Sequence, residues 1–249
     1  MKRTKILLVG AKGRMGQAIS AATSTETDLV ISALCDRGEP LEPAIRGCDV
    51  VIDFSQPGAV NELCRLCLQN KKPIVIGTTG HSTQQKEEIK KAATIVPIVF
   101  APNFSVGVNA LFWLTRKAAE LLGPDFDLEV VEMHHRFKKD APSGTAKKLA
   151  EILSEARKLD REKNVRHGRE GNIGERPATE IGIHALRGGD MVGEHFVIFA
   201  GPGERLELAH KASSRATFAL GALRAARWVV GKPAGLYSME DVLGLSAAS

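Results

Sequence analysis

The first hundred residues alternate short apolar runs with stretches of helical spacing, and this alternation constrains the fold more than any other feature. The apolar runs are continuous and rich in Val, Ile and Leu: Lys5–Val9, Leu29–Cys35, Val50–Phe54, Ile74–Ile76 and Ile98–Ala101. Continuous runs are typical of parallel strands covered on both faces. The helical stretches between them are Met15–Ala22, Val60–Gln69 and Gln84–Ala93. The pattern predicts an α/β domain with a doubly wound, Rossmann-type parallel sheet.

The pattern changes after residue 105. A helix is expected at Val106–Leu122, a strand at Leu128–His134 and a second helix at Ala146–Lys158. Three apolar runs joined by glycine-rich turns follow later, at Glu180–Leu186, His195–Ala200 and Leu206–Ala212. Successive strands with short turns predict a mixed or antiparallel sheet, and therefore a second domain of α+β type.

Two further segments flank these strands. The polar stretch Asp160–Arg176 is dense in Arg, Lys, Glu and Gly, and we expect a long exposed excursion that is the least ordered part of the chain. Arg215–Val230 has helical spacing again, and Ser238 with Asp241 three residues later predicts a helix start.

Composition excludes several classes of protein. A chain of 249 residues with 43% hydrophobic residues is long and apolar enough for one large domain or two modest ones. No apolar run approaches the roughly 20 residues of a membrane span, so we expect no membrane partner. The first run, Lys5–Val9, is too short for a secretory signal. Four cysteines fit a reducing cytoplasm better than a disulfide scaffold.

The net charge of +5 suits an anionic partner, which can be nucleic acid, a phosphorylated cofactor or a polycarboxylate. Only 5% of the residues are aromatic, which weighs against single-stranded nucleic acid. The charge alone does not choose among these partners.

A glycine-rich loop joins the first strand to the first helix. Gly10, Gly13 and Gly16 have the spacing of a turn that brings backbone N–H groups and a helix N-terminus to a pyrophosphate. Asp36 lies about twenty residues after Gly16, where an acidic residue binds the adenosine ribose of NAD. Arg37 follows and can pair with the 2′-phosphate of NADP instead. We therefore expect a dinucleotide site that uses NADH, NADPH or both.

Two more loops follow strands of the same predicted sheet. Gly77-Thr78-Thr79-Gly80 follows the fourth run, and Ala101-Pro102-Asn103-Phe104 follows the fifth. Ligands of open α/β sheets bind at the carboxyl ends of the strands. These loops are therefore candidates for nicotinamide contacts.

The densest group of proton-transferring residues lies near the middle of the chain. His134, His135, Lys138 and Lys139 precede Ser143-Gly144-Thr145, which opens a predicted helix. Histidine transfers protons near neutral pH, and a helix N-terminus with hydroxyl groups suits a carboxylate. Together with the dinucleotide site, this segment predicts hydride transfer to a small carboxylated substrate.

The element His-His-x-x-Lys-x-Asp-Ala-Pro-Ser-Gly-Thr resembles the signature of the 4-hydroxy-tetrahydrodipicolinate reductase (dihydrodipicolinate reductase) family. The glycine loop, the two strand-end loops, Gly189–His195 and His210–Arg215 are also similar, in the same order, so the resemblance covers essentially the whole chain. It implies NAD(P)H-dependent reduction of 4-hydroxy-tetrahydrodipicolinate, with hydride delivered to C4 and water lost, in diaminopimelate and lysine biosynthesis.

The resemblance also implies roles for single residues. His134 would be the proton donor or acceptor and Lys138 its partner, while His135, Ser143, Gly144 and Thr145 would bind the dicarboxylate. The cofactor residues would be Gly10, Ala11, Lys12, Gly13, Arg14, Met15, Asp36, Arg37, Gly77, Thr78, Thr79, Ala101, Pro102, Asn103 and Phe104. Residues 1–105 and 215–249 would form the dinucleotide-binding domain, and residues 106–214 a domain that binds substrate and builds a homotetramer.

Three other functions are less consistent with these motifs. A different NAD(P)-dependent dehydrogenase would not carry the His134–Thr145 element in this form. A dinucleotide sensor that binds nucleic acid would need a recognition helix, and the sequence has none, so no nucleic-acid partner is expected. Cys64 and Cys67 form a C-x-x-C inside a helical stretch without further ligands nearby, so we expect packing and no metal. Gln56 replaces a basic residue found in some relatives, which weakens a strong NADPH preference.

Overall fold

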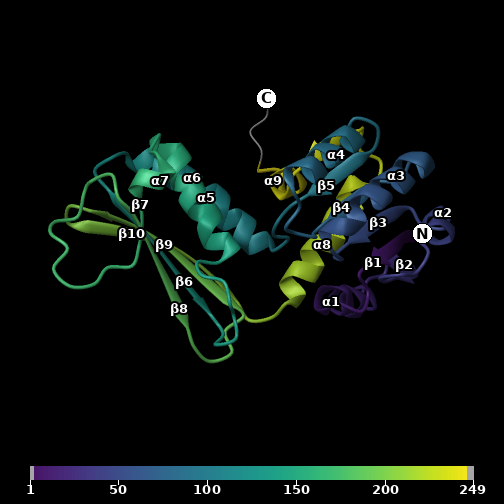
Figure 1. Cartoon of the computed structure of the whole chain (residues 1–249), viewed down its shortest axis with the longest axis horizontal. Coiled ribbons are helices and arrows are strands. Elements are labelled where there is room, and N and C mark those ends of the chain that lie inside the picture. Colours follow the sequence, from purple (N-terminus) through teal and green to yellow (C-terminus); the bar gives the residue numbers. More distant parts are fainter. Residues whose placement is uncertain (1–2, 246–249) are drawn as a thin grey trace. The chain divides into compact units, whose positions relative to one another are not determined.

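The computed structural model describes residues 3–245 and divides into two compact units (Figure 1). One unit contains the chain up to Val106 and again from Arg215 onward, and the other contains Gly107–Ser214. The outermost residues of the predicted boundaries, 1–2 and 246–249, lie outside the described residues. None of the helices in residues 3–245 is long and apolar enough to cross a membrane.

The first unit is built on a parallel sheet, as the sequence predicts, and this sheet has six strands in the order β11-β5-β4-β3-β1-β2. The strands are β1 (Thr4–Val9), β2 (Leu29–Cys35), β3 (Val50–Asp53), β4 (Ile74–Ile76), β5 (Pro97–Phe100) and β11 (Gly235–Tyr237). The strand order reverses at β1, which pairs with both β2 and β3. A doubly wound sheet has its crevice at this reversal, beyond the carboxyl ends of the strands.

Helices cover both faces of this sheet, which explains why its strands are continuously apolar. On one face, α2, α3 and α4 bury Ile45, Leu63 and Ile89 against the sheet. On the other face, α1, α8 and α9 bury Ile19, Ala222 and Val242. The helices are α1 (Arg14–Thr23), α2 (Glu42–Arg46), α3 (Val60–Asn70, preceded by the 3₁₀ turn Pro57–Ala59), α4 (Thr83–Ala93), α8 (Ala216–Val229) and α9 (Met239–Leu243).

The second unit contains a mixed sheet in the order β10-β9-β6-β8-β7. Its strands are β6 (Asp127–His134), β7 (Val165–His167), β8 (Ile181–Arg187), β9 (Gly193–Gly201) and β10 (Glu204–Ala212). β8 and β9 are joined by a glycine turn but do not pair, because β6 lies between them, parallel to β8 and antiparallel to β9. The mixed character of the sheet confirms the α+β prediction.

Helices α5 (Val106–Leu122) and α6 (Gly144–Arg157) pack on one face of this sheet. Alternate residues of β6 therefore point into the core, and the burial along the strand alternates from Asp127 to His134. This period of two places Glu132 and His134 together on the helix-covered face.

Residues of the Asp160–Arg176 segment are exposed or half-buried, as expected, but the segment is more ordered than the expectation of the least ordered part of the chain. The segment contains a short helix, α7 (Arg161–Asn164), and the edge strand β7. Arg169 Nη2 and Arg176 Nε donate hydrogen bonds to Glu129 Oε1 on β6, over 2.6 and 3.1 Å. Ion pairs with a residue forty or more positions away hold the segment on the sheet, and local composition does not reveal such partners.

Candidate active site

The glycine loop forms a turn that only glycine permits at two of its positions. Gly10 has φ +81°, and a Cβ there would lie 2.4 Å from the Phe54 carbonyl oxygen. A Cβ on Gly16 would lie 2.2 Å from the Gly10 carbonyl oxygen. Gly13 is the N-cap of α1, so the N–H groups of the first helical turn face the strand ends. The backbone shape fits a pyrophosphate held at a helix N-terminus.

The acidic residue after β2 holds the glycine loop in place. Asp36 Oδ2 accepts a hydrogen bond of 2.7 Å from the Lys12 backbone N–H, and Oδ1 accepts one of 2.8 Å from Arg37 N–H. These two bonds lower the pKa of the Asp36 carboxyl, with the Arg37 bond contributing most. Asp36 therefore presents a carboxylate at the edge of the crevice, as a ribose-binding residue requires.

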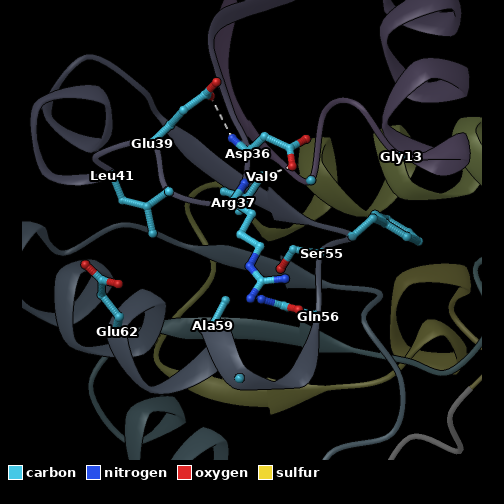
Figure 2. A pocket seen from close by; sticks show the side chains of 14 residues that line it. Val9, Gly13, Asp36, Arg37, Glu39, Leu41, Ser55, Gln56, Ala59 and Glu62 are labelled. Carbon is cyan, nitrogen blue, oxygen red and sulfur yellow. Dashed lines mark hydrogen bonds between the residues drawn. The ribbon is translucent and has the colours of Figure 1, made fainter.

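A cavity of about 440 Å³ opens beside this carboxylate (Figure 2). Figure 2 shows the Arg37 side chain extending into it on the side of Ser55 and Gln56. Four residues predicted for the cofactor line its wall: Gly10, Gly13, Asp36 and Arg37. The wall also includes residues that received no role from the sequence, among them Glu39, Phe54, Ser55 and Glu62. Only the Asp-Phe-Ser sequence at the end of β3 offered a signal for some of these.

The remaining predicted cofactor residues lie outside the wall of this cavity: Ala11, Lys12, Arg14, Met15, Gly77, Thr78, Thr79 and Ala101–Phe104. Several of their side chains serve the fold. Thr78 Oγ1 donates a 2.6 Å hydrogen bond to buried Asp53 and accepts one from Ser55 N–H. Phe104 is buried, with its ring 5.5 Å from that of Phe54. Residues such as these can reach a cofactor only through their backbone.

The second unit brings a carboxylate, a histidine and an arginine together at the end of β6. Glu132 is completely buried and its Oε2 lies 2.5 Å from His134 Nδ1. Arg187 on β8 donates two hydrogen bonds to the same carboxylate, each of 2.8 Å. The Ser143 backbone N–H donates a fourth, of 3.0 Å. Every acceptor position of the buried carboxylate is used, which is what burial of a charge requires.

The charges of this cluster decide which nitrogen of His134 carries a proton. Burial raises the pKa of Glu132, but the bonds from Arg187, His134 and Ser143 outweigh it, so the pKa is lowered. Burial lowers the pKa of His134, against the opposing effect of Glu132. An ionised Glu132 accepts a hydrogen bond from Nδ1–H, which leaves Nε2 of the neutral ring as a proton acceptor. Nε2 would lie 3.0 Å from a Cβ placed on Gly193, so the ring packs directly on that glycine.

Lys138 lies in the loop after β6, and its ammonium group contacts Asp140 at 2.8 and 3.0 Å. This hydrogen bond lowers the pKa of the Asp140 carboxyl. The Asp140 carbonyl oxygen in turn accepts a bond from Arg187, so Lys138 is connected to the Glu132 cluster. His135 Nδ1 and Arg187 Nε are buried without a partner among the described residues, and such atoms beside a cluster are typical of a ligand site.

The start of α6 has the geometry of an anion-binding helix N-terminus. Ser143 is the N-cap and its Oγ accepts a hydrogen bond from Ala146 N–H. The same Oγ lies 3.0 Å from Nε2 of His195 on β9. Burial, and next the charge of His134, lowers the pKa of His195 to about 3, so this ring is neutral. Ser143 is thus fixed between helix and sheet, and the N–H groups of the helix's first turn, which begins at Gly144, remain directed at the site.

The residues that sequence reasoning missed here are Glu132, Asp140, Arg187 and His195. Glu132 precedes His134 by two positions on a strand. Side chains alternate between the two faces of a strand, so this spacing was a signal that could have placed both side chains on one face. Arg187 and His195 join the site only through strand pairing, which the sequence does not reveal.

All four cysteines are free and buried. Cys64 and Cys67 lie in the core between α3 and the sheet, as expected for packing residues. Burial raises the pKa of Cys64 to about 11. Within residues 3–245, no group of three His, Cys, Asp or Glu side chains has the arrangement of a metal site.

A Rossmann-type sheet with a glycine loop, in one chain with a unit that carries a histidine, a lysine and an anion-binding helix start, defines an oxidoreductase of the dinucleotide-binding class. Comparison with known proteins identifies the family. Family profiles described as the N- and C-terminal regions of dihydrodipicolinate reductase match residues 4–104 and 107–243. The chain belongs to the dihydrodipicolinate reductase family.

Individual relatives agree. The chain is 60% identical over 241 residues to a 4-hydroxy-tetrahydrodipicolinate reductase of Akkermansia muciniphila, covering 97% of this chain and 98% of the relative. A reductase of the same name from Hahella chejuensis is 47% identical, covering 97% and 99%. The solved structure of dipicolinate-bound dihydrodipicolinate reductase from Paenisporosarcina sp. TG-14 matches with a TM-score of 0.78 and 25% identity, covering 95% of this chain and 97% of that one.

Proposed function

We propose that the chain catalyses the NAD(P)H-dependent reduction of 4-hydroxy-tetrahydrodipicolinate to tetrahydrodipicolinate, with hydride transfer to C4 and loss of the 4-hydroxyl group as water, in diaminopimelate and lysine biosynthesis. The observation that carries the proposal is the cluster of Glu132, His134 and Arg187 beside the N-terminus of α6. It combines a proton-transferring group with a carboxylate-binding group, and it lies in a chain of this family.

The dinucleotide would lie at the carboxyl ends of β1 and β2, in the first unit. The fit rests on the loop geometry, because Gly10 and Gly16 allow a turn too tight for a Cβ, and on the cavity beside Asp36 and Arg37. When bound, the reduced nicotinamide supplies the hydride. The protein's own residues bind the pyrophosphate through backbone N–H groups and the ribose through Asp36.

The substrate would lie in the second unit, with one carboxylate at the first turn of α6 near Gly144 and Thr145. His135 contributes a buried ring nitrogen to the same region. Lys138 carries the proton donor, an ammonium group held by Asp140. Lys138 would donate the proton with which the 4-hydroxyl group leaves as water, and His134, neutral and with Nε2 unprotonated, would accept a proton from solvent and relay it to replace the one that Lys138 gave up.

We infer further that the chain forms a homotetramer through the sheet face that α5 and α6 do not cover. Val131, Met133, Phe196 and Ile198 are half-buried on that face, and Leu186 is 44% exposed. Adjacent apolar residues on an exposed face are typical of an interface. Light scattering after size-exclusion chromatography tests this inference, and a monomer at micromolar concentration would contradict it.

A coupled assay tests the activity directly. The synthase that makes the substrate from pyruvate and aspartate semialdehyde is supplied first, and the oxidation of NADH and NADPH is then followed separately at 340 nm. We expect oxidation only when both carbon substrates and the synthase are present. Substrate-independent oxidation, or none with either cofactor, would contradict the proposal.

A further inference from the structure

Glu39 connects the glycine loop to the turn after β2, a role that no sequence motif indicates. Its Oε1 accepts a hydrogen bond of 2.8 Å from Lys12 Nζ, and its Oε2 accepts one of 2.8 Å from the Asp36 backbone N–H. Figure 2 shows the second bond at the edge of the cavity. The Glu39 carboxylate thus holds both the Lys12 ammonium group and the backbone of Asp36, the residue proposed to bind the ribose.

This contact changes the charge available to a ligand. Lys12 is the cation of the glycine loop nearest to Asp36, and its ammonium group is engaged by Glu39. The hydrogen bond between them raises the pKa of Lys12 and lowers that of Glu39, so both groups stay ionised and paired. A phosphate that contacts Lys12 would have to share its ammonium group with Glu39.

The wall of the cavity is acidic. Of its charged residues, Asp36, Glu39 and Glu62 are negative and Arg37 is positive. A ribose with free hydroxyl groups donates hydrogen bonds to a carboxylate. A 2′-phosphate instead carries close to two negative charges and would meet Asp36 and Glu39 at the same place.

We propose that Glu39 is a specificity-determining residue that disfavours the 2′-phosphate, both by its own charge and by holding Lys12, so that the protein prefers NADH to NADPH. The proposal rests on the dinucleotide site proposed above and deepens it. Arg37 remains as the cation that permits NADPH to bind at all.

The test compares adenosine fragments with and without the 2′-phosphate, by isothermal titration of 2′,5′-ADP and 5′-AMP. The change is Glu39→Gln, which removes the charge and weakens the hold on Lys12. Removing one unit charge near a doubly charged group at the protein surface is expected to tighten 2′,5′-ADP by about three- to tenfold. The affinity for 5′-AMP should stay within about twofold. The ratio of kcat/KM for NADPH to that for NADH should rise by the same factor.

Two further variants make the result specific. The double variant Glu39→Gln with Lys12→Ala should lose the part of the gain that the released ammonium group supplies and keep the part that comes from the removed charge of Glu39. Glu42→Gln is the matched control, since Glu42 is an exposed carboxylate near the same turn that pairs with Arg46 and does not line the cavity. It should leave the fragment ratio unchanged.

The outcomes separate the two proposals. If wild type binds the dinucleotides and Glu39→Gln leaves the fragment ratio unchanged, Glu39 is not a specificity determinant and the proposed function stands. A gain of equal size in Glu42→Gln would also overturn the role of Glu39. If wild type binds neither NADH nor NADPH, the dinucleotide site itself is wrong.

Discussion

Arg187 and Glu132 are 55 positions apart, yet they form a two-pronged ion pair in which both hydrogen bonds measure 2.8 Å. The carboxylate of Glu132 is completely buried, and it also contacts His134 Nδ1. The Glu132 carboxylate therefore keeps a negative charge beside His134, and the Arg187 guanidinium compensates that charge. The pair fixes the imidazole tautomer, while burial, acting against Glu132, lowers the pKa of His134.

The pH dependence of activity tests this role of Glu132. His134 has a lowered pKa, so its neutral form persists below the ordinary value of 6.5, and activity should decline only as the pH falls through the lowered pKa. Glu132 opposes this lowering, so Glu132→Gln should move the acid limb of the kcat profile to lower pH and reduce kcat by about ten- to a hundredfold. The measurement is kcat between pH 4.5 and 8, by stopped-flow assay.

Glu129→Gln is the control for that variant. Glu129 lies on the same strand and also pairs with an arginine, Arg169, but on the sheet face opposite His134. Its loss should change stability and leave the acid limb in place. An acid limb that stays fixed in Glu132→Gln would show that Glu132 does not position the proton.

Replacement of the two proton-transferring residues should separate chemistry from cofactor binding. His134→Gln or Lys138→Ala should each lower kcat by about 10²–10⁴-fold, the usual loss for general acid–base groups. The dissociation constant of NADH, measured by fluorescence titration, should change by less than about twofold because its site lies in the other unit. Near-normal kcat in both variants would exclude these residues as the proton-transferring pair.

Gly193 should be intolerant of a side chain because His134 packs on it. A Cβ at Gly193 would lie 3.0 Å from His134 Nε2, so Gly193→Ala is expected to displace the ring by a few tenths of an ångström and to lower kcat/KM by roughly tenfold. Gly188→Ala is the matched control, since the nearest atom to its Cβ is 3.9 Å away, on Met191. Equal effects of the two changes in steady-state assays would remove the steric explanation.

The free energy of unfolding at acid pH should depend on the buried ring of His195. Its pKa is about 3 in the folded protein, below the unfolded value of 6.5, so the unfolded state binds the proton first. Stability therefore falls as the pH drops from about 6.5 toward 3, by up to about 1.4 kcal/mol per pH unit from this group. His195→Gln should reduce that slope in urea unfolding curves. His167→Gln, an exposed position on β7, should not.

The turn at the glycine loop predicts a strong effect of Gly16→Ala. Its Cβ would lie 2.2 Å from the Gly10 carbonyl oxygen, so the loop must move and lose its fit to the pyrophosphate. We expect NADH binding to weaken by more than about tenfold and stability to fall by roughly 1–3 kcal/mol. Gly47→Ala, whose nearest contact is 3.8 Å, should change neither property by a comparable amount in calorimetry.

The sequence predicted the five apolar strands and the mixed second sheet because their patterns are local. It did not predict α2 (Glu42–Arg46), β7 (Val165–His167) or β11 (Gly235–Tyr237), which are short. Elements of this length depend on tertiary contacts, as β11 does by pairing with β5. The ordered path of Asp160–Arg176 was missed for the same reason.

The candidate site was predictable in part. Residue types alone pointed to the segment that contains His134 and Lys138, and the family resemblance singled out these two residues within it. Glu39 and Arg187 gain their roles from partners elsewhere in the chain, Lys12 and Glu132. Such pairs depend on the order of the strands and on the path of the turns, which composition and periodicity do not encode.

The first unit is completed by a segment that is translated after the second unit. Helix α8 buries Ala219, Ala222 and Leu223 against the sheet face that also contains Ile6 and Leu8. Until residues 216–229 have emerged, that apolar face lacks its cover, while the second unit, Gly107–Ser214, is already fully synthesised. The inserted unit can therefore fold first, and the nascent N-terminal sheet is the stretch that most needs protection from aggregation during translation.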